Sequence, residues 1–211
     1  MKIHQHIISA LVLSTFSLPT LAESLLNQST YGNDYVTVTG YLGSRVNKEF
    51  DNDATNKKVN VSSELTQAIA LGWSYAKNSE GELIFSSSKE NFSSADDFDL
   101  DVYVQYLHFG GRIFFKNSTP FSSSIGLGIG GTYFNPSGNE YDDKLAFSGS
   151  ISGGIRYQLS KQFALRSDLR VYGTLLDTDD ELFCANGACN LNLSDSLYVE
   201  AELLAGVEYK F

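Results

Sequence analysis

The chain has 211 residues, which is enough for one domain, and its formal net charge is −10. Removing residues 1–22 takes away one lysine and no acid, so the remainder carries 14 − 25 = −11. This sign argues against nucleic acid as a partner, because nucleic-acid binding needs a basic surface. The 18 glycines and 12 tyrosines favour an antiparallel all-β protein with small residues on one face.

The first 22 residues predict a secretory signal peptide. Lys2 lies near the start, an apolar run covers residues 7–21, and the small residues Thr20 and Ala22 precede the expected cleavage point. A transmembrane helix is the alternative, but the run is short and contains three serines. We therefore expect a signal peptide at residues 1–22 and one exported domain at residues 23–211, with no transmembrane helix in that domain.

In chain order, the exported domain contains eight segments in which apolar residues alternate with small or polar ones, as in strands with two different faces. They cover residues 34–46, 65–76, 82–89, 100–115, 121–134, 145–157, 163–175 and 197–211. The connections between them are alternately long and short. The long ones cover residues 47–64, 90–99, 135–144 and 176–196.

The last segment has an apolar face that ends on Tyr209 and Phe211, and an opposite face with three glutamates. A soluble sandwich would turn the apolar face to a core, whereas a transmembrane barrel turns it to lipid. The even number of strands, their length and the alternating connections favour the barrel. They predict that both termini are periplasmic and that the long connections face outward.

Aromatic residues on the apolar faces collect at the end with the short turns, where a membrane barrel has an interfacial girdle. They are Trp73, Tyr75, Phe115, Phe121, Tyr157, Phe163, Tyr209 and Phe211.

The closing pair Tyr209 and Phe211 resembles the C-terminal signature of bacterial outer-membrane β-barrels, which the barrel-insertion machinery reads. Residues 82–88 (ELIFSSS), 106–111 (YLHFGG) and 172–184 (YGTLLDTDDELFC) resemble one subgroup of the small OmpA- and OmpX-like barrels of proteobacteria. The resemblance implies an eight-stranded up-and-down antiparallel transmembrane β-barrel in the cell outer membrane. Its implied partners are outer-membrane lipid, lipopolysaccharide and the insertion machinery. It implies no activity.

The predicted inward faces carry four arginines and four acids. They are Arg112, Arg156, Arg166, Arg170, Asp168, Glu200, Glu202 and Glu208. An eight-stranded barrel is just wide enough for side chains to fill it, and an unpaired buried charge costs several kcal/mol. We therefore expect a salt-bridge network that plugs the lumen. A narrow pore for ions or a conduit for small apolar molecules is the alternative, favoured by the glycines and serines of the fifth and sixth segments.

His108 is the only histidine of the exported domain. Barrels that hydrolyse lipids resemble one another in combining a histidine with a serine and an acid. Here the H-x-S pattern of the lipid A deacylases is absent, and His108 is predicted to face inward toward Tyr106 and Arg112. We therefore predict no catalytic residue, no cofactor and no enzyme, and a lipid-modifying activity is the third alternative.

Two features lie in the last long connection. Cys184 and Cys189 flank the turn-forming pair Asn186-Gly187, which predicts a disulfide closing a hairpin tip in an exported protein.

Residues 177–181 include three aspartates and Glu181. This predicts a solvated acidic loop, with a weak Ca²⁺ or Mg²⁺ site that bridges to lipopolysaccharide phosphates as the alternative. Overall, the sequence predicts a structural or surface-interaction role for the outer loops.

Overall fold

The structure is a computed structural model that describes most of residues 23–211. The backbone is described for residues 35–47, 50–52, 57–94, 98–118, 120–137, 143–176, 182–185, 188–191 and 197–211. Side chains are described for residues 35–46, 64–93, 100–115, 120–137, 143–176 and 197–211. The predicted signal peptide at residues 1–22 and the acidic loop at residues 177–181 lie outside these ranges.

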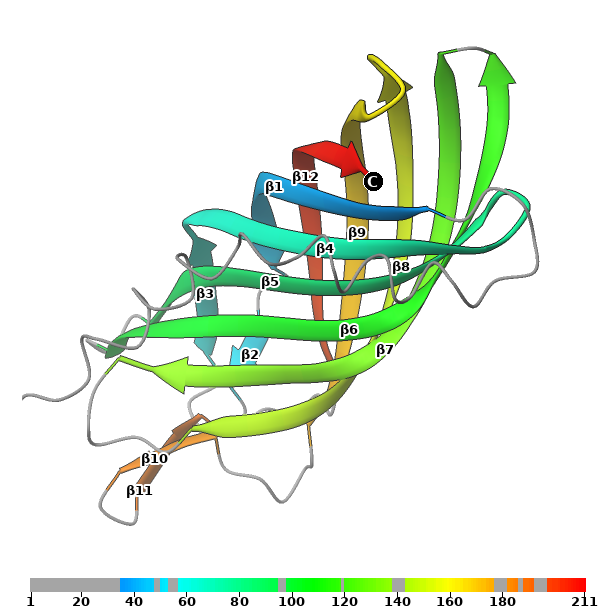
Figure 1. Ribbon diagram of the computed structural model, residues 1–211. Helices are drawn as coiled ribbons and strands as arrows, with labels where there is room; N and C mark the ends of the chain where they lie inside the picture. Colours follow the sequence, from blue (N-terminus) through cyan, green and yellow to red (C-terminus); the bar gives the residue numbers. More distant parts are fainter. Residues whose placement is uncertain are drawn as a thin grey trace, which may run out of the picture.

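Eight long antiparallel strands close into a barrel (Figure 1). They are β1 (Val36–Asn47), β4 (Leu65–Ala76), β5 (Ser79–Ser94), β6 (Phe98–Ser118), β7 (Phe121–Pro136), β8 (Lys144–Gln158), β9 (Phe163–Leu175) and β12 (Leu197–Lys210). Each strand pairs with the next around the wall, and β12 closes the barrel on β1. The predicted eight-stranded antiparallel barrel is therefore confirmed.

Four short strands extend the outer end of the barrel. They are β2 (Phe50–Asn52), β3 (Lys57–Ser63), β10 (Leu182–Ala185) and β11 (Ala188–Leu191). β3 pairs with the outer part of β5, next to the place where β4 begins, and β2 pairs with β3. β10 and β11 form a separate hairpin.

The register of the strands fixes their tilt. A path through directly opposed residues leaves β1 at Val36 and passes through every strand of the wall. It returns to β1 at Val46, ten residues further on. A stagger of this size in an eight-stranded barrel tilts the strands by about 40° from the axis, so roughly ten residues of each strand cross a bilayer.

Two of the predicted long connections are partly wrong, because the strand ladders continue into them, and the short connection at residues 77–81 is partly wrong because β5 begins at Ser79. Residues 47–64 contain β2 and β3, and residues 90–99 contain the outer ends of β5 and β6. The outward side chains of Lys89 and Asp101 are polar, as expected where the wall stands above the lipid. The apolar alternation therefore stops at the membrane surface while the backbone hydrogen bonds continue.

The outer surface of the wall is an apolar band. Large apolar side chains are exposed on every strand of the barrel; Leu127 and Leu145, for example, are 67% and 72% exposed. Soluble monomers rarely expose contiguous apolar patches above a few hundred Å². The soluble sandwich is therefore wrong, and the band is the lipid-facing surface.

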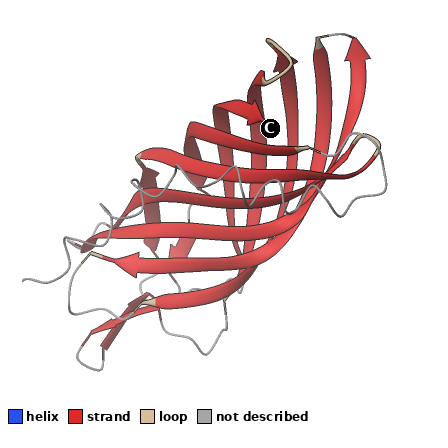
Figure 2. Ribbon diagram, in the orientation of Figure 1, coloured by secondary structure: helices blue, strands red, loops and turns tan. Residues whose placement is uncertain are grey.

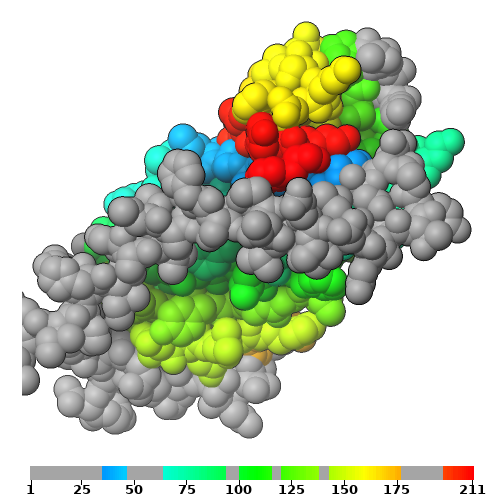
Figure 3. Space-filling model, in the orientation of Figure 1, coloured from blue at the N-terminus to red at the C-terminus, as the bar shows by residue number. Residues whose placement is uncertain are grey.

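Aromatic rings border this band at the end with the short turns. Phe121 lies against Tyr157 at 4.7 Å between ring centroids, and Tyr209 lies against Phe163 at 5.1 Å and Phe211 at 4.8 Å. In Figure 3 the yellow β8–β9 turn and the red C-terminal end gather at the same end of the molecule. We call it the periplasmic end, following the prediction from the loop pattern.

Strands make up the whole described wall (Figure 2). Among the residues that the structure describes, no helix is long and apolar enough to cross a membrane.

Trp73, the only tryptophan of the chain, covers Gly81 on the neighbouring strand. A Cβ at Gly81 would lie 2.2 Å from the indole ring, which also stacks on Phe109 at 5.6 Å. We expect Gly81→Ala to displace the ring, to shift the tryptophan fluorescence and to destabilise the barrel by about 1–3 kcal/mol. Gly40→Ala is the matched control, because a Cβ at Gly40 meets nothing within 4 Å. Equal urea midpoints for the two variants would contradict the expectation.

Candidate functional site

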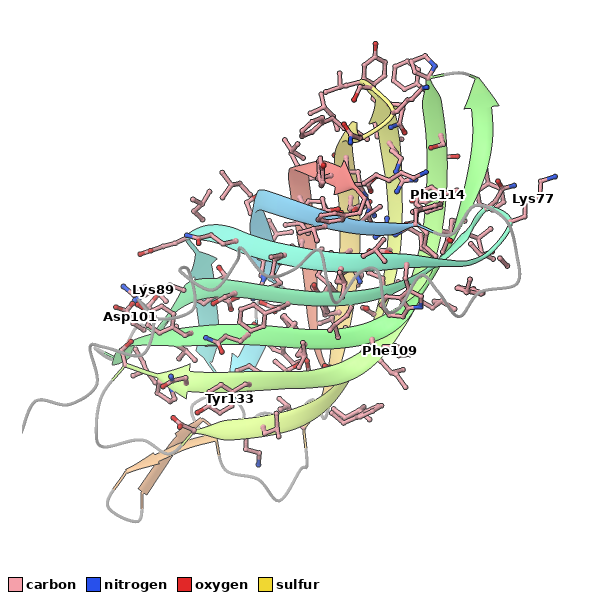
Figure 4. The ribbon with its side chains drawn as sticks, viewed as in Figure 1. Lys77, Lys89, Asp101, Phe109, Phe114 and Tyr133 are labelled. Carbon is pink, nitrogen blue, oxygen red and sulfur yellow. The ribbon has the colours of Figure 1, made fainter. Side chains whose placement is uncertain are left out.

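The lumen is the candidate site, because the strands turn most of their charged and hydrogen-bonding side chains into it. Tilted strands bring residues from distant parts of the chain to one level of the axis. Lys77 marks the periplasmic end and Lys89 the outer end in Figure 4. The buried arginines and acids between these ends form two hydrogen-bonded groups.

Glu82 is the centre of the group nearer the periplasm. Its Oε2 lies 2.7 Å from Arg112 Nη2 and 3.6 Å from Arg166 Nη2, and its Oε1 accepts a hydrogen bond from Arg170. Asp168 lies beside it, 2.6 Å from Arg112 Nη1 and 3.2 Å from Arg166 Nη2. Two carboxylates therefore lie among three guanidiniums.

The same group continues to the periplasmic mouth. Arg156 Nη2 lies 2.9 Å from Glu80 Oε1 and 2.6 Å from Glu208 Oε2. The guanidinium also lies 4.2 Å above the ring of Phe114, and Tyr35 donates to Glu80 at 2.5 Å. We call this group the lower network. Its charged members are Glu80, Glu82, Arg112, Arg156, Arg166, Asp168, Arg170 and Glu208, four of each sign.

Arg45 is the centre of the second group, nearer the outer end. Its Nε lies 2.9 Å from Glu202 Oε1, and its Nη1 lies 3.3 Å from Glu90 Oε1 and 3.9 Å from Glu200 Oε2. Nη2 donates to Ser86 at 2.7 Å. All four charged side chains are fully buried.

Three tyrosine hydroxyls complete this group. Tyr172 donates to Glu202 Oε2 at 2.9 Å, and Tyr106 donates to Glu200 Oε2. The Tyr198 hydroxyl lies 2.7 Å from Glu200 Oε1 and 3.0 Å from Glu90 Oε2. We call this group the upper network: Arg45, Ser86, Glu90, Tyr106, Tyr172, Tyr198, Glu200 and Glu202.

Apolar layers enclose the upper network. On its lower side, the rings of two of its members, Tyr106 and Tyr172, stack at 3.8 Å with an interplanar angle of 11°, and a cluster built on Ile84 and Leu204 lies below them. Above it lies a buried apolar lid. The lid consists of Phe92, Leu100, Val102, Val104, Phe134 and Leu176, together with the ring of Tyr198. The upper network is thus separated from water on both sides.

His108 lies between the networks and is 1% exposed. Its Nδ1 is 2.9 Å from Ser150 Oγ and its Nε2 is 2.8 Å from Ser148 Oγ. In a Ser-His-acid triad, one ring nitrogen meets the serine and the other meets the acid. Because both nitrogens of His108 meet serines, this arrangement ties β6 to β8 and lacks the triad geometry.

All eight predicted lumen charges lie in the two networks. Sequence reasoning missed four others: Arg45, Glu80, Glu82 and Glu90. Arg45 lies on the polar face of the first predicted strand, so the alternation itself could have identified it. Glu80 and Glu90 lie near the two ends of β5. The sequence pattern assigned them to connections, because it predicted β5 too short at both ends.

The remaining predicted residues lie at the ends of the barrel. The backbone N–H of Phe211 donates to the carbonyl of Val36 at 2.9 Å, which joins the C-terminus to β1; its role as an insertion signal stays a prediction. Cys184 and Cys189 are directly opposed in the β10–β11 hairpin. Their side chains lie outside the described part, so the disulfide stays a prediction.

The outer rim carries an exposed ion pair above the apolar band. Lys89 Nζ lies 2.8 Å from Asp101 Oδ2 (Figure 4). The hydrogen bond from Lys89, followed by one from Asn91, holds the pKa of Asp101 below its ordinary value. Among the side chains that are described, no group of three or more His, Cys, Asp or Glu residues is arranged to hold a metal ion.

Several solved structures of outer-membrane proteins have the same fold as this chain. The outer membrane protein OprG from Pseudomonas aeruginosa aligns with a TM-score of 0.58 at 13% identity, over 87% of this chain and 98% of that one. Neisserial surface protein A aligns at 0.53 and 13%, over 84% and 97%. The fold is that of the small eight-stranded outer-membrane β-barrels. No protein-family model and no curated protein matches the sequence.

A third outer-membrane barrel shows the same likeness. Ail, the attachment invasion locus protein of Yersinia pestis, aligns at 0.50 and 13%, over 84% of this chain and 98% of that one. These likenesses concern the fold. Together with the apolar band and the aromatic girdle, they assign this barrel to the cell outer membrane.

Proposed function

We propose that this outer-membrane barrel has a lumen closed by its own side chains, and that it acts through its outer loops in a structural or surface-interaction role. The observation that carries the proposal is the filling of the lumen: two ionic networks, two stacked tyrosines and an apolar lid lie in series along the axis. A water-filled pore needs a continuous polar path, and the lid interrupts it.

Small residues in the lumen do not favour the pore alternative, because large neighbours occupy the space beside them. A Cβ at Gly130 would lie 2.7 Å from the imidazole of His108, and one at Gly126 would lie 3.7 Å from the Cβ of Arg112. The glycines and serines of β7 and β8 thus accommodate His108 and Arg112, whose Nη1 reaches Ser124 at 3.1 Å.

Single-channel conductance tests the closed lumen. We expect the refolded mature chain to insert into a planar bilayer without discrete openings; heat-modifiable migration in a gel would show that the barrel is folded. Reproducible openings would overturn the closed lumen. Arg112, Arg156, Arg166 and Glu202 would then be the residues to substitute.

The absence of an enzymatic activity is also part of the proposal. His108 is enclosed and held by two serines, so we expect His108→Gln to leave the lipid A and phospholipid composition of the host membrane unchanged. A change in acyl-chain composition that requires both the chain and His108 would favour the lipid-modifying alternative.

Partners at the cell surface follow from the same proposal. Outer-membrane lipid surrounds the apolar band, lipopolysaccharide surrounds the outer rim, and the insertion machinery would read Tyr209 and Phe211. With a net charge of −11 after removal of residues 1–22, contact with phosphate groups would need bridging cations at residues 177–181. A calorimetric titration without heat from Ca²⁺ would remove this bridge from the proposal.

A further inference from the structure

A hollow of about 330 Å³ lies on the lipid-facing surface of the wall, where β8, β9 and β12 run side by side (Figure 1). This volume is at the lower end of the range for small-molecule sites, about 300–1,000 Å³. The outward-facing residues that line it are all apolar: Gly149, Ile151, Val171, Gly173 and Val199. We propose that this hollow seats one acyl chain of lipopolysaccharide.

The floor of the hollow is recessed below the surface around it. Gly149 and Gly173 are directly opposed on β8 and β9, and Val199 on β12 is opposed to Gly173. All three are only half-buried on the outer face, whereas Phe147 and Leu175, each two residues from a floor glycine, are large and exposed. The exposed side chains therefore project on both sides of a lower floor.

The packing of the chain itself does not require these glycines. A Cβ at Gly149 would lie 3.7 Å from its nearest neighbour, the carbonyl oxygen of Gly128. One at Gly173 would lie 3.5 Å from a methyl group of Leu197, and neither glycine has a left-handed φ. Glycine weakens the interior of a strand and often marks a place where a ligand approaches the backbone closely. We therefore attribute the open floor to an occupant from outside the chain.

The position of the hollow selects a hydrocarbon chain as this occupant, because the apolar band is surrounded by lipid. On β8 the band ends at Leu145, next to the polar residue Asp143, whose carboxylate accepts a hydrogen bond from Tyr133. Gly149 is four residues further along β8. At about 3.3 Å per residue and a tilt of about 40°, it lies roughly 10 Å below the edge of the band. The hydrocarbon core is about 30 Å thick, so the hollow lies in the leaflet next to the outer rim.

In the proposed orientation, this leaflet is the one that contains lipopolysaccharide, so the inference rests on the proposed function. A second barrel is a poorer fit. A stable protein interface buries about 800 Å² on each partner, whereas the recessed floor consists of only three residues in register. A seated acyl chain would hold the barrel among lipopolysaccharide molecules at the cell surface.

Photo-labelling of the barrel refolded into phospholipid vesicles tests the seat. The probe is a phosphatidylcholine with a diazirine in one acyl chain, and mass spectrometry of peptides locates the label. We expect several-fold more label at residues 145–151 and 171–175 than at Ile69. Ile69 is the reference because it is exposed, lies four residues from the outermost apolar residue Leu65, and belongs to β4, across the barrel from β8. Added lipopolysaccharide should displace the label from the hollow several-fold more than from Ile69.

Gly149→Leu fills the hollow from its floor, and it should remove both the excess label and the response to lipopolysaccharide. Gly153→Leu is the matched control on the same face of β8, because its partner on β9, Leu169, is exposed and already projects there. A Cβ at Gly153 would lie 3.9 Å from its nearest neighbour, so this variant should fold and keep the excess. Gly173→Val is the second filling variant if Gly149→Leu lacks the heat-modifiable migration of a folded barrel.

Equal labelling of the hollow and of Ile69 in the wild type, or an excess that survives when the hollow is filled, would overturn the proposal. Labelling weaker than at Ile69 would show that a second copy covers the hollow. An excess that lipopolysaccharide does not displace would show that the seat holds phospholipid, and either result would also overturn the proposal. These measurements do not depend on conductance or on orientation in the cell, so they can fail independently of the proposed function.

Discussion

Glu82→Ala is expected to destabilise the barrel by about 3–5 kcal/mol, the cost of removing one partner from a buried ion pair. Glu82 contacts three guanidiniums, from Arg112, Arg166 and Arg170. Arginine cannot relieve its charge by losing a proton. Arg112 and Arg166 would keep Asp168, and Arg166 would also keep Glu208, whereas Arg170 would lose the one carboxylate that it contacts among the described side chains. Urea unfolding of the barrel refolded into lipid vesicles, followed by the fluorescence of its single tryptophan, measures the loss.

Asp101→Asn is the control for this measurement. It also removes a carboxylate from an ion pair, but its partner Lys89 lies on the exposed outer rim, where water and salt screen the interaction. We expect no measurable shift of the urea midpoint for Asp101→Asn. Equal midpoints for the two variants would show that the lower network does not contribute to stability as the structure indicates.

Arg45→Met is expected to have an effect of similar size at pH 8, and acid should reduce this effect. The change leaves the carboxylates of Glu90, Glu200 and Glu202 without the guanidinium that they share. Carboxylates can bind protons, so the folded variant holds more protons than the unfolded chain, and its stability falls as pH rises. The loss should therefore be about 3–5 kcal/mol at pH 8 and distinctly smaller at pH 5.

Glu82→Ala should differ from Arg45→Met in the pH dependence of its stability. Excess guanidinium charge in the lower network persists throughout this pH range, so acid does not rescue Glu82→Ala. Urea midpoints of both variants at pH 5 and pH 8, relative to the wild type, are the measurement. Parallel pH responses for the two variants would contradict the prediction.

The sequence predicts the barrel well where lipid imposes a two-residue alternation. The ranges of β4 and β9 agree with the structure at both ends, because apolar side chains such as Ile69 and Leu169 alternate there with small or polar ones. Above the lipid the rule no longer applies. Lys89 and Asn91 face water beside inward residues that are also polar, so the outer half of β5 resembles a loop in sequence.

The sequence predicts which side chains of the site point into the lumen, but it predicts much less well which of them contact one another. Alternation identifies Arg112 and Asp168 as inward residues, but their contact joins side chains 56 positions apart and depends on the ten-residue stagger. The centre of the lower network was missed for the same reason. Glu82 lies at the predicted start of a strand, and the sequence around it does not indicate that it contacts three arginines from β6 and β9.

The stacked rings of Tyr106 and Tyr172 divide the lumen into two compartments whose described side chains differ in their balance of charge. Substitutions within one compartment share partners, so their effects should be strongly non-additive. Across the rings the coupling is indirect, through Ser150, which contacts both Arg170 and His108, so pairs taken across them should combine more nearly additively. Natural variation in this barrel would then show two separate groups of interdependent positions. One group could be exchanged for another solution, such as a fully apolar filling, while the other stays unchanged.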